Sequence, residues 1–98
     1  MARTDKVRTV KGIPTKIELR PAGESPYKLK KIELTVNEFE AIRLADFEGE
    51  SHEEAAKLMN VSRPTFSRIV EKARKKVSDF IVEGKKLVIE GGNFEVLD

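Results

Sequence analysis

The chain has 98 residues, a formal net charge of +2 and no cysteine. This length supports one domain with one modest core and leaves no room for a large cofactor-binding architecture. The lack of cysteine excludes disulfide frameworks, cysteine-based zinc sites, thiol nucleophiles and iron–sulfur clusters, and it fits a reducing, cytoplasmic location. No apolar run exceeds three residues, whereas roughly 20 are needed to span a bilayer, so we expect no membrane association.

Charge is distributed unevenly along the chain. Residues 1–31 carry nine Lys/Arg against three Asp/Glu, residues 32–61 carry two against eight, and residues 62–85 carry seven against three. The near-neutral total therefore conceals two basic segments separated by an acidic one. Such segregation indicates a surface with one side that faces a polyanion.

The first third of the chain is expected to be extended. Residues 1–14 are basic and lack apolar periodicity, which predicts a flexible arm. Residues 15–34 form an extended or β segment, because polar and apolar side chains alternate at 16–20 and again at 31–34. The first alternation predicts a strand. The second predicts either a short strand or an extended lead into a helix.

Three helices are expected within residues 35–84. Thr35 and Glu38 have the capping-box spacing, and they start a helix over 36–48 that a glycine ends. Ser51 starts a second, short helix in the same way.

The third helix has the clearest periodicity in the sequence. Ser62 caps it, Pro64 is tolerated in its first turn and Gly84 ends it. One apolar stripe runs along the helix, formed by Phe66, Ile69, Val70, Ala73, Val77, Phe80 and Ile81. Beyond this helix, residues 85–98 predict a C-terminal β-hairpin around a Gly-Gly turn.

Residues 52–71 meet the requirements of a helix-turn-helix. Ala56 supplies the small side chain needed where two helices cross closely, and Asn60 tolerates the positive φ that the turn requires. Apolar residues that can clamp the corner follow at suitable spacings: Met59, Val61, Phe66 and Ile69. We therefore expect a mainly α fold, a three-helix helix-turn-helix domain over 35–84 with short β-strands near both termini.

The polar face of the third helix, about residues 63–83, is the candidate major-groove surface, because it points away from the apolar stripe. Arg68 could chelate the O6 and N7 atoms of guanine. The candidate DNA-binding residues are Ser62, Arg63, Pro64, Thr65, Ser67, Arg68, Lys72 and Lys75. Candidate phosphate contacts are Ser51, His52, Arg74, Lys76 and, in the arm, Arg3, Lys6, Arg8 and Lys11.

The same pattern has a structural alternative. Arg68, Glu71 and Lys75 also have the spacing of ion pairs on a solvated helix face. A carboxylate near phosphates is repelled unless it accepts a hydrogen bond from cytosine N4 or a neighbouring cation neutralises it. We expect Arg68 and Lys75 to neutralise Glu71. His52 fits a solvated surface position as well as a phosphate contact.

A family resemblance is carried by residues 34–49 (LTVNEFEAIRLADFEG), by 53–66 with its Val-Ser-Arg-Pro-Thr-Phe end, and by Glu90-Gly91-Gly92. These stretches resemble the domain of unknown function 134 family, and the similarity extends over almost the whole chain. Members are small bacterial and archaeal proteins to which DNA binding is attributed, through a helix-turn-helix similar to that of region 4 in sigma factors. The resemblance implies a regulator of transcription that binds specific double-stranded DNA sequences.

Other functions fit the sequence less well than DNA binding. Catalysis is not expected, since the chain has no cysteine, one histidine and no glycine-rich phosphate loop, and we expect no cofactor or metal. The stronger rival is a protein-interaction module of the transcription machinery, in which the acidic segment 32–61 binds a basic partner. RNA binding is less favoured because Phe39, Phe47, Phe66 and Phe80 are expected in the core. A homodimer is expected, because two modules reach adjacent major grooves about 34 Å apart.

Overall fold

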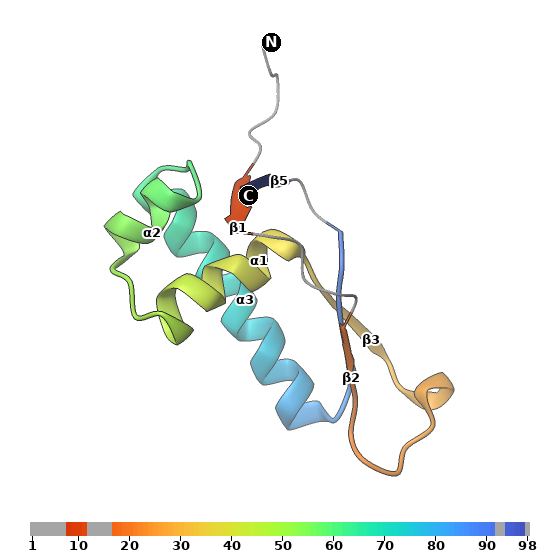
Figure 1. Ribbon diagram of the computed structural model, residues 1–98. Helices are drawn as coiled ribbons and strands as arrows, with labels where there is room; N and C mark the ends of the chain where they lie inside the picture. Colours follow the sequence, from red (N-terminus) through yellow and green to blue (C-terminus); the bar gives the residue numbers. More distant parts are fainter. Residues whose placement is uncertain (1–7, 12–16, 92–93, 98) are drawn as a thin grey trace.

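The computed structural model describes residues 8–11, 17–91 and 94–97 (Figure 1). This part of the chain is mainly α with short strands, as the sequence predicts. The helices are α1 (Val36–Ile42), α2 (His52–Leu58) and α3 (Arg63–Glu83), with a 3-10 turn η1 (Pro26–Lys28) and a π-helical turn η2 (Arg43–Phe47). The strands are β1 (Arg8–Lys11), β2 (Ile17–Leu19), β3 (Lys31–Leu34), β4 (Lys86–Ile89) and β5 (Phe94–Leu97).

The strands form two small sheets. In the three-stranded sheet the order is β2-β4-β3, with β4 antiparallel to β2 and parallel to β3. The second alternation in the sequence is therefore a strand, β3. The other sheet is a parallel pair of β1 and β5, the first and last of these strands, which lie side by side in Figure 1.

Two expectations about the ends of the chain are wrong. The C-terminal hairpin does not form, because β4 is the central strand of its sheet and has both edges occupied by β2 and β3. The strand expected to pair with it, β5, pairs with β1 instead. Because β1 pairs with β5, Arg8–Lys11 is a strand and not part of the flexible arm expected over residues 1–14.

α1 begins at the predicted capping box. The Thr35 hydroxyl accepts a hydrogen bond from the Glu38 amide at 3.2 Å, and the Glu38 carboxylate accepts one from the Thr35 amide at 2.9 Å. α1 passes directly into η2, in which the Glu48 amide donates to the Arg43 carbonyl at 2.8 Å. This wider turn adds a residue and rotates the later side chains by about 100° around the helix axis. Phe47, expected in the core, is 81% exposed for this reason.

α2 begins, and α3 begins and ends, where the sequence predicts. Ser51 and Ser62 are their N-caps, and each hydroxyl accepts a hydrogen bond from the third amide of its helix. α3 ends at Gly84, which has a left-handed conformation. Between the two helices Asn60 has a φ of 58°, the positive value expected of the turn.

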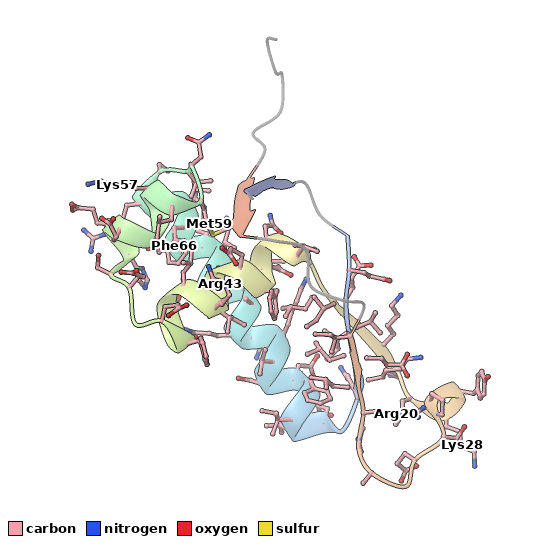
Figure 2. All side chains as sticks on the ribbon, viewed as in Figure 1. Arg20, Lys28, Arg43, Lys57, Met59 and Phe66 are labelled. Carbon is pink, nitrogen blue, oxygen red and sulfur yellow. The ribbon has the colours of Figure 1, made fainter. Side chains whose placement is uncertain are left out.

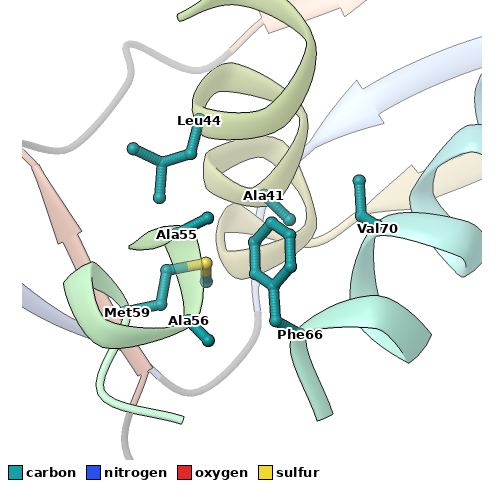
Figure 3. Packing of buried hydrophobic residues seen from close by; sticks show 7 residues of the cluster. All are labelled: Ala41, Leu44, Ala55, Ala56, Met59, Phe66 and Val70. Atoms are coloured by element: carbon teal, nitrogen blue, oxygen red, sulfur yellow. The ribbon is translucent and has the colours of Figure 1, made fainter. Parts of the chain in front are cut away.

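Two hydrophobic clusters hold the helices and the sheet together. One lies where α1, α2 and α3 meet and is built around Phe66, Met59 and Val70 (Figure 3). The other joins α3 to the sheet, and its buried members are Ile32, Leu34, Ala73, Leu87 and Ile89. The predicted stripe of α3 supplies both clusters, except that Val77 is half-buried outside them and Ile81 is 67% exposed. It lies near the end of α3, where nothing in the described chain covers that side.

Candidate nucleic-acid interface

Small residues allow α2 to lie close to its neighbours. Ala55 and Ala56 are buried on α2, and Figure 3 shows them beside the Phe66 ring and the Met59 side chain. Phe66 and Met59 have no exposed surface, so the corner between α2 and α3 is filled by side chains. The packing fixes the direction in which α3 presents its outer face.

The outer face of α3 is exposed and basic. Pro64, Arg68, Glu71 and Lys75 are all exposed, and they recur at helical spacing opposite the buried residues. Arg63 and Lys72 flank them and are exposed too. Within the described residues, none of the four cations Arg63, Arg68, Lys72 and Lys75 forms an ion pair, so Arg68 and Lys75, which we expect to neutralise Glu71, make no ion pair with it.

Hydrogen bonds organise the N-terminal turn of α3. The Ser62 hydroxyl accepts from the Thr65 amide at 3.3 Å and donates to the Thr65 hydroxyl at 2.9 Å. The Arg68 guanidinium donates to the same Thr65 hydroxyl at 3.3 Å. These contacts direct Arg68 back toward the start of the helix, where a major-groove helix meets base edges.

His52 and Ser67 contact each other across the corner. Nδ1 of His52 lies 2.8 Å from the Ser67 hydroxyl, and the imidazole meets the Phe66 ring edge-on with 5.2 Å between centroids. Both side chains are half-buried. The sequence predicts a phosphate contact for His52 and a base contact for Ser67, but not the contact between them. Their spacing of 15 residues carries no local signal for it.

Two of the candidate phosphate contacts have their cationic groups engaged within the protein. The Arg74 guanidinium donates to both carboxylate oxygens of Asp46, at 2.7 and 3.1 Å. This hydrogen bonding holds the pKa of Asp46 below its ordinary value and raises the pKa of Arg74. The Lys76 ammonium donates to the Glu33 carbonyl and to the buried Glu38 carboxylate, at 2.8 and 2.7 Å. Asp46 lies 28 residues from its partner and is not among the residues predicted from the sequence.

The remaining candidate residues are less informative. Ser51 is exposed and caps α2 by accepting from the Glu54 amide at 3.1 Å. Of the arm residues, Arg8 and Lys11 are the first and last residues of β1. Arg3 and Lys6 lie outside the described residues.

An acidic segment borders the start of α2. Residues 46–54 contain five Asp/Glu and no Lys or Arg. Glu53 and Glu54, in the first turn of α2, are exposed. Carboxylates here stabilise the helix N-terminus, but they repel phosphate, so this segment limits how close α2 can come to a nucleic-acid backbone.

Two other kinds of site are absent from the described part of the chain. It contains no group of three His, Cys, Asp or Glu side chains that could hold a metal ion. None of its helices is long and apolar enough to cross a membrane.

Known proteins with similar sequences identify the family. The family model described as protein of unknown function DUF134 matches residues 1–97. A UPF0251 protein of Thermoanaerobacter pseudethanolicus is 48% identical over 98 residues, which cover 100% of this chain and 83% of that relative. One from Desulfosudis oleivorans is 48% identical over 94 residues, which cover 96% of this chain and 68% of the relative. No solved structure matches the chain. The chain therefore belongs to the DUF134 family.

Proposed function

We propose that this protein binds double-stranded DNA in a sequence-specific manner and regulates transcription, with α2 and α3 acting as a helix-turn-helix. α3 enters the major groove in this proposal. The observation that carries the proposal is a set of four exposed cations on α3, Arg63, Arg68, Lys72 and Lys75, that form no ion pair with any described residue. Phosphates and guanine edges are the partners that such groups fit.

Different residues have different roles in this proposal. Arg68, held by Thr65 near the start of α3, reads a base edge. Lys72 and Lys75, one and two turns further on, contact phosphates and contribute affinity without sequence preference. His52 acts as a positioning residue, because it holds Ser67 and supports the Phe66 ring from α2.

The test measures DNA binding by fluorescence anisotropy at several salt concentrations. The first probe is a random-sequence duplex pool, and the second is the set of tight binders selected from that pool. Each phosphate contact adds about −0.9 to the slope of log affinity against log salt. Replacing Arg68 and Lys75 together by Ala should weaken binding at least about ten-fold and reduce the slope by about one. The matched control is Lys28→Ala with Lys30→Ala, which removes two exposed lysines that lie outside α3, between β2 and β3, and should leave both quantities unchanged.

A second candidate function rests on the acidic segment 46–54. Phe47 is 81% exposed within it, which suits a basic partner protein of the transcription machinery that also offers an apolar contact. This candidate predicts weak, sequence-blind DNA binding that the Arg68 and Lys75 substitutions do not change. Such a result would contradict the DNA-binding proposal.

A further inference from the structure

The three-stranded sheet has two outer edges, one on β2 and one on β3, because β4 lies between these strands. In the part of the chain that the structure describes, no further strand pairs with either edge. The backbone amides and carbonyls along such an edge can pair with another strand. The two edges differ in how well the apolar side chains beside them are covered.

The core under the sheet is closed at the β3 edge and open at the β2 edge. Ile32, Leu87 and Leu19 lie opposite one another on the three strands, so their side chains form one row on the face that α3 covers. Along this row the exposed fraction is 9% at Ile32, 3% at Leu87 and 44% at Leu19. The row therefore ends in a partly exposed leucine at β2.

The other face of β2 carries one acidic and one basic side chain. Glu18 lies on β2, and Arg20 follows the strand directly, where the chain continues toward η1 (Figure 2). Their carboxylate and guanidinium groups are 3.7 Å apart, and both side chains are exposed. An exposed ion pair of this kind contributes little to stability, so either group can change its partner readily.

We propose that β2 pairs with β2 of a second copy of this chain, antiparallel about a two-fold axis perpendicular to the sheet. Leu19 lies at the axis, so Glu18 of each copy lies opposite Arg20 of the other. The two three-stranded sheets then form one continuous sheet, with both α3 helices on the same face. The inference goes beyond the proposed DNA binding and does not depend on it.

The charges select this register of the two strands. A shift by one residue would move core-facing side chains to the wrong face, so the alternative registers differ in steps of two residues. In one neighbouring register Glu18 lies opposite Glu18 of the other copy, and in the next Arg20 lies opposite Arg20. Like charges directly opposite each other are unfavourable. Only the register with Leu19 at the axis gives two pairs of opposite charge.

The same register closes the open side of the core. Leu19 of each copy lies opposite Leu19 of the other, so each covers part of the other's exposed apolar surface. The β3 edge offers no such gain, because Ile32 and Leu34 beside it are already buried. The cation of that edge, Lys31, is bound to Glu90 at 2.8 Å. A second copy therefore fits the β2 edge better than the β3 edge.

Pairing through one short strand makes a small interface. β2 has three residues, and Pro21, which has no amide hydrogen, stands directly after Arg20. The contact belongs to the weak class of interfaces, which bury less than about 1,200 Å². We therefore expect a dissociation constant on the order of 100 µM, with a monomer in dilute solution.

Charge reversal tests the pairing by sedimentation equilibrium of the full chain at up to about 1 mM protein. The mass of the wild type should rise from 11.1 kDa toward twice that value. Glu18→Lys and Arg20→Glu should each weaken association at least about ten-fold, because each converts both opposite-charge pairs into like-charge pairs. The double variant should recover the wild-type affinity within about three-fold, and a mixture of the two single variants should form mixed dimers.

The matched control for charge reversal is Glu24→Lys. It reverses an exposed carboxylate in the turn after β2 and should leave the affinity unchanged. All the altered side chains are exposed, so circular dichroism should show that every variant remains folded.

Cysteine cross-linking tests the register without charge reversal. The chain has no cysteine, so Leu19→Cys places a single thiol opposite its own copy, where the Cβ atoms are about 4.5–5.5 Å apart. This variant should form a disulfide-linked dimer under mild oxidation. A mixture of Glu18→Cys and Arg20→Cys should give mainly the mixed dimer. Each of these variants alone should give little, because its two thiols lie on diagonal positions about 7–8 Å apart.

Three results would overturn the proposal. A wild type that stays at 11.1 kDa at every concentration lacks this interface and leaves the β2 edge to an extended segment of another protein. A dimer that neither charge reversal weakens uses a different surface. An excess of self-linked Glu18→Cys or Arg20→Cys over the mixed dimer shows a different register.

Discussion

His52 and Ser67 join the two helices of the corner by a contact of 2.8 Å between Nδ1 and the hydroxyl. The ring that makes this contact also lies edge-on to Phe66, the largest fully buried side chain of the protein's described core. One half-buried residue therefore supports the angle between α2 and α3 in two ways.

Replacing His52 by Ala should lower the free energy of unfolding by about 1–2 kcal/mol, because a hydrogen bond and an aromatic contact are lost together. Urea denaturation measures the change. His52→Gln keeps an amide that can reach Ser67 and should lose less than half as much. Equal losses in the two variants would show that the hydrogen bond contributes nothing.

The turn residue Asn60 should tolerate glycine better than alanine. Its φ of 58° costs a residue with a Cβ roughly 1–2 kcal/mol, which asparagine reduces and glycine avoids. Asn60→Ala should therefore destabilise the protein by about 1 kcal/mol in thermal or urea unfolding, and Asn60→Gly should leave stability nearly unchanged. The opposite order would be inconsistent with a left-handed residue in this turn.

Lys75 and Lys76 are neighbours with opposite expected roles. Lys76→Ala leaves the Glu38 carboxylate, 5% exposed, with the Thr35 amide but without its cation, and should destabilise the protein by about 1–3 kcal/mol. Lys75→Ala removes an exposed ammonium and should change stability by less than about 0.5 kcal/mol. In DNA titrations the order of the two variants should reverse. Only Lys75→Ala should reduce the slope of log affinity against log salt. A reduced slope in both variants would show that Lys76 also reaches phosphate.

The Asp46–Arg74 pair predicts a dependence of stability on pH. The pKa of Asp46 is held below its ordinary value of 3.8 by Arg74, so the unfolded chain binds this proton more readily than the folded one. The contribution is therefore present above about pH 4 and is lost as the pH falls through the lowered pKa. Because both side chains are nearly half exposed, it should be at most about 1 kcal/mol.

The measurement for this pair is urea denaturation of the wild type and Asp46→Asn between pH 2 and 7. The variant should be less stable at neutral pH, and the difference should vanish toward pH 2. A difference that is constant over this range would contradict an electrostatic origin.

Local signals in the sequence predicted most of the helical architecture. Capping residues, a glycine stop and the apolar stripe of α3 act within a few residues, so the start of α2, both ends of α3 and the positive φ of Asn60 could be located in advance. The exposure of Arg68 and Lys75 followed from the same periodicity.

Long-range partners could not be predicted in this way. The pairing of β5 with β1 depends on which sheet edges are free, and an extended strand carries no record of its partner. The contacts of Arg74 with Asp46 and of Lys76 with Glu38 join residues 28 and 38 positions apart. The core position predicted for Phe47 is wrong, because one π-helical turn rotates side chains around the helix axis. The composition of the sequence carries no signal of such a turn.

The parallel pairing of β3 with β4 has a consequence for synthesis on the ribosome. All three helices lie between these two strands in the chain, and the second cluster needs Leu87 and Ile89 from the later strand. While residues 86–89 remain inside the exit tunnel, α3 therefore lacks the apolar surface that covers its sheet-facing side. The nascent chain can assemble the corner of α2 and α3 first, but the second cluster can form only after β4 has emerged.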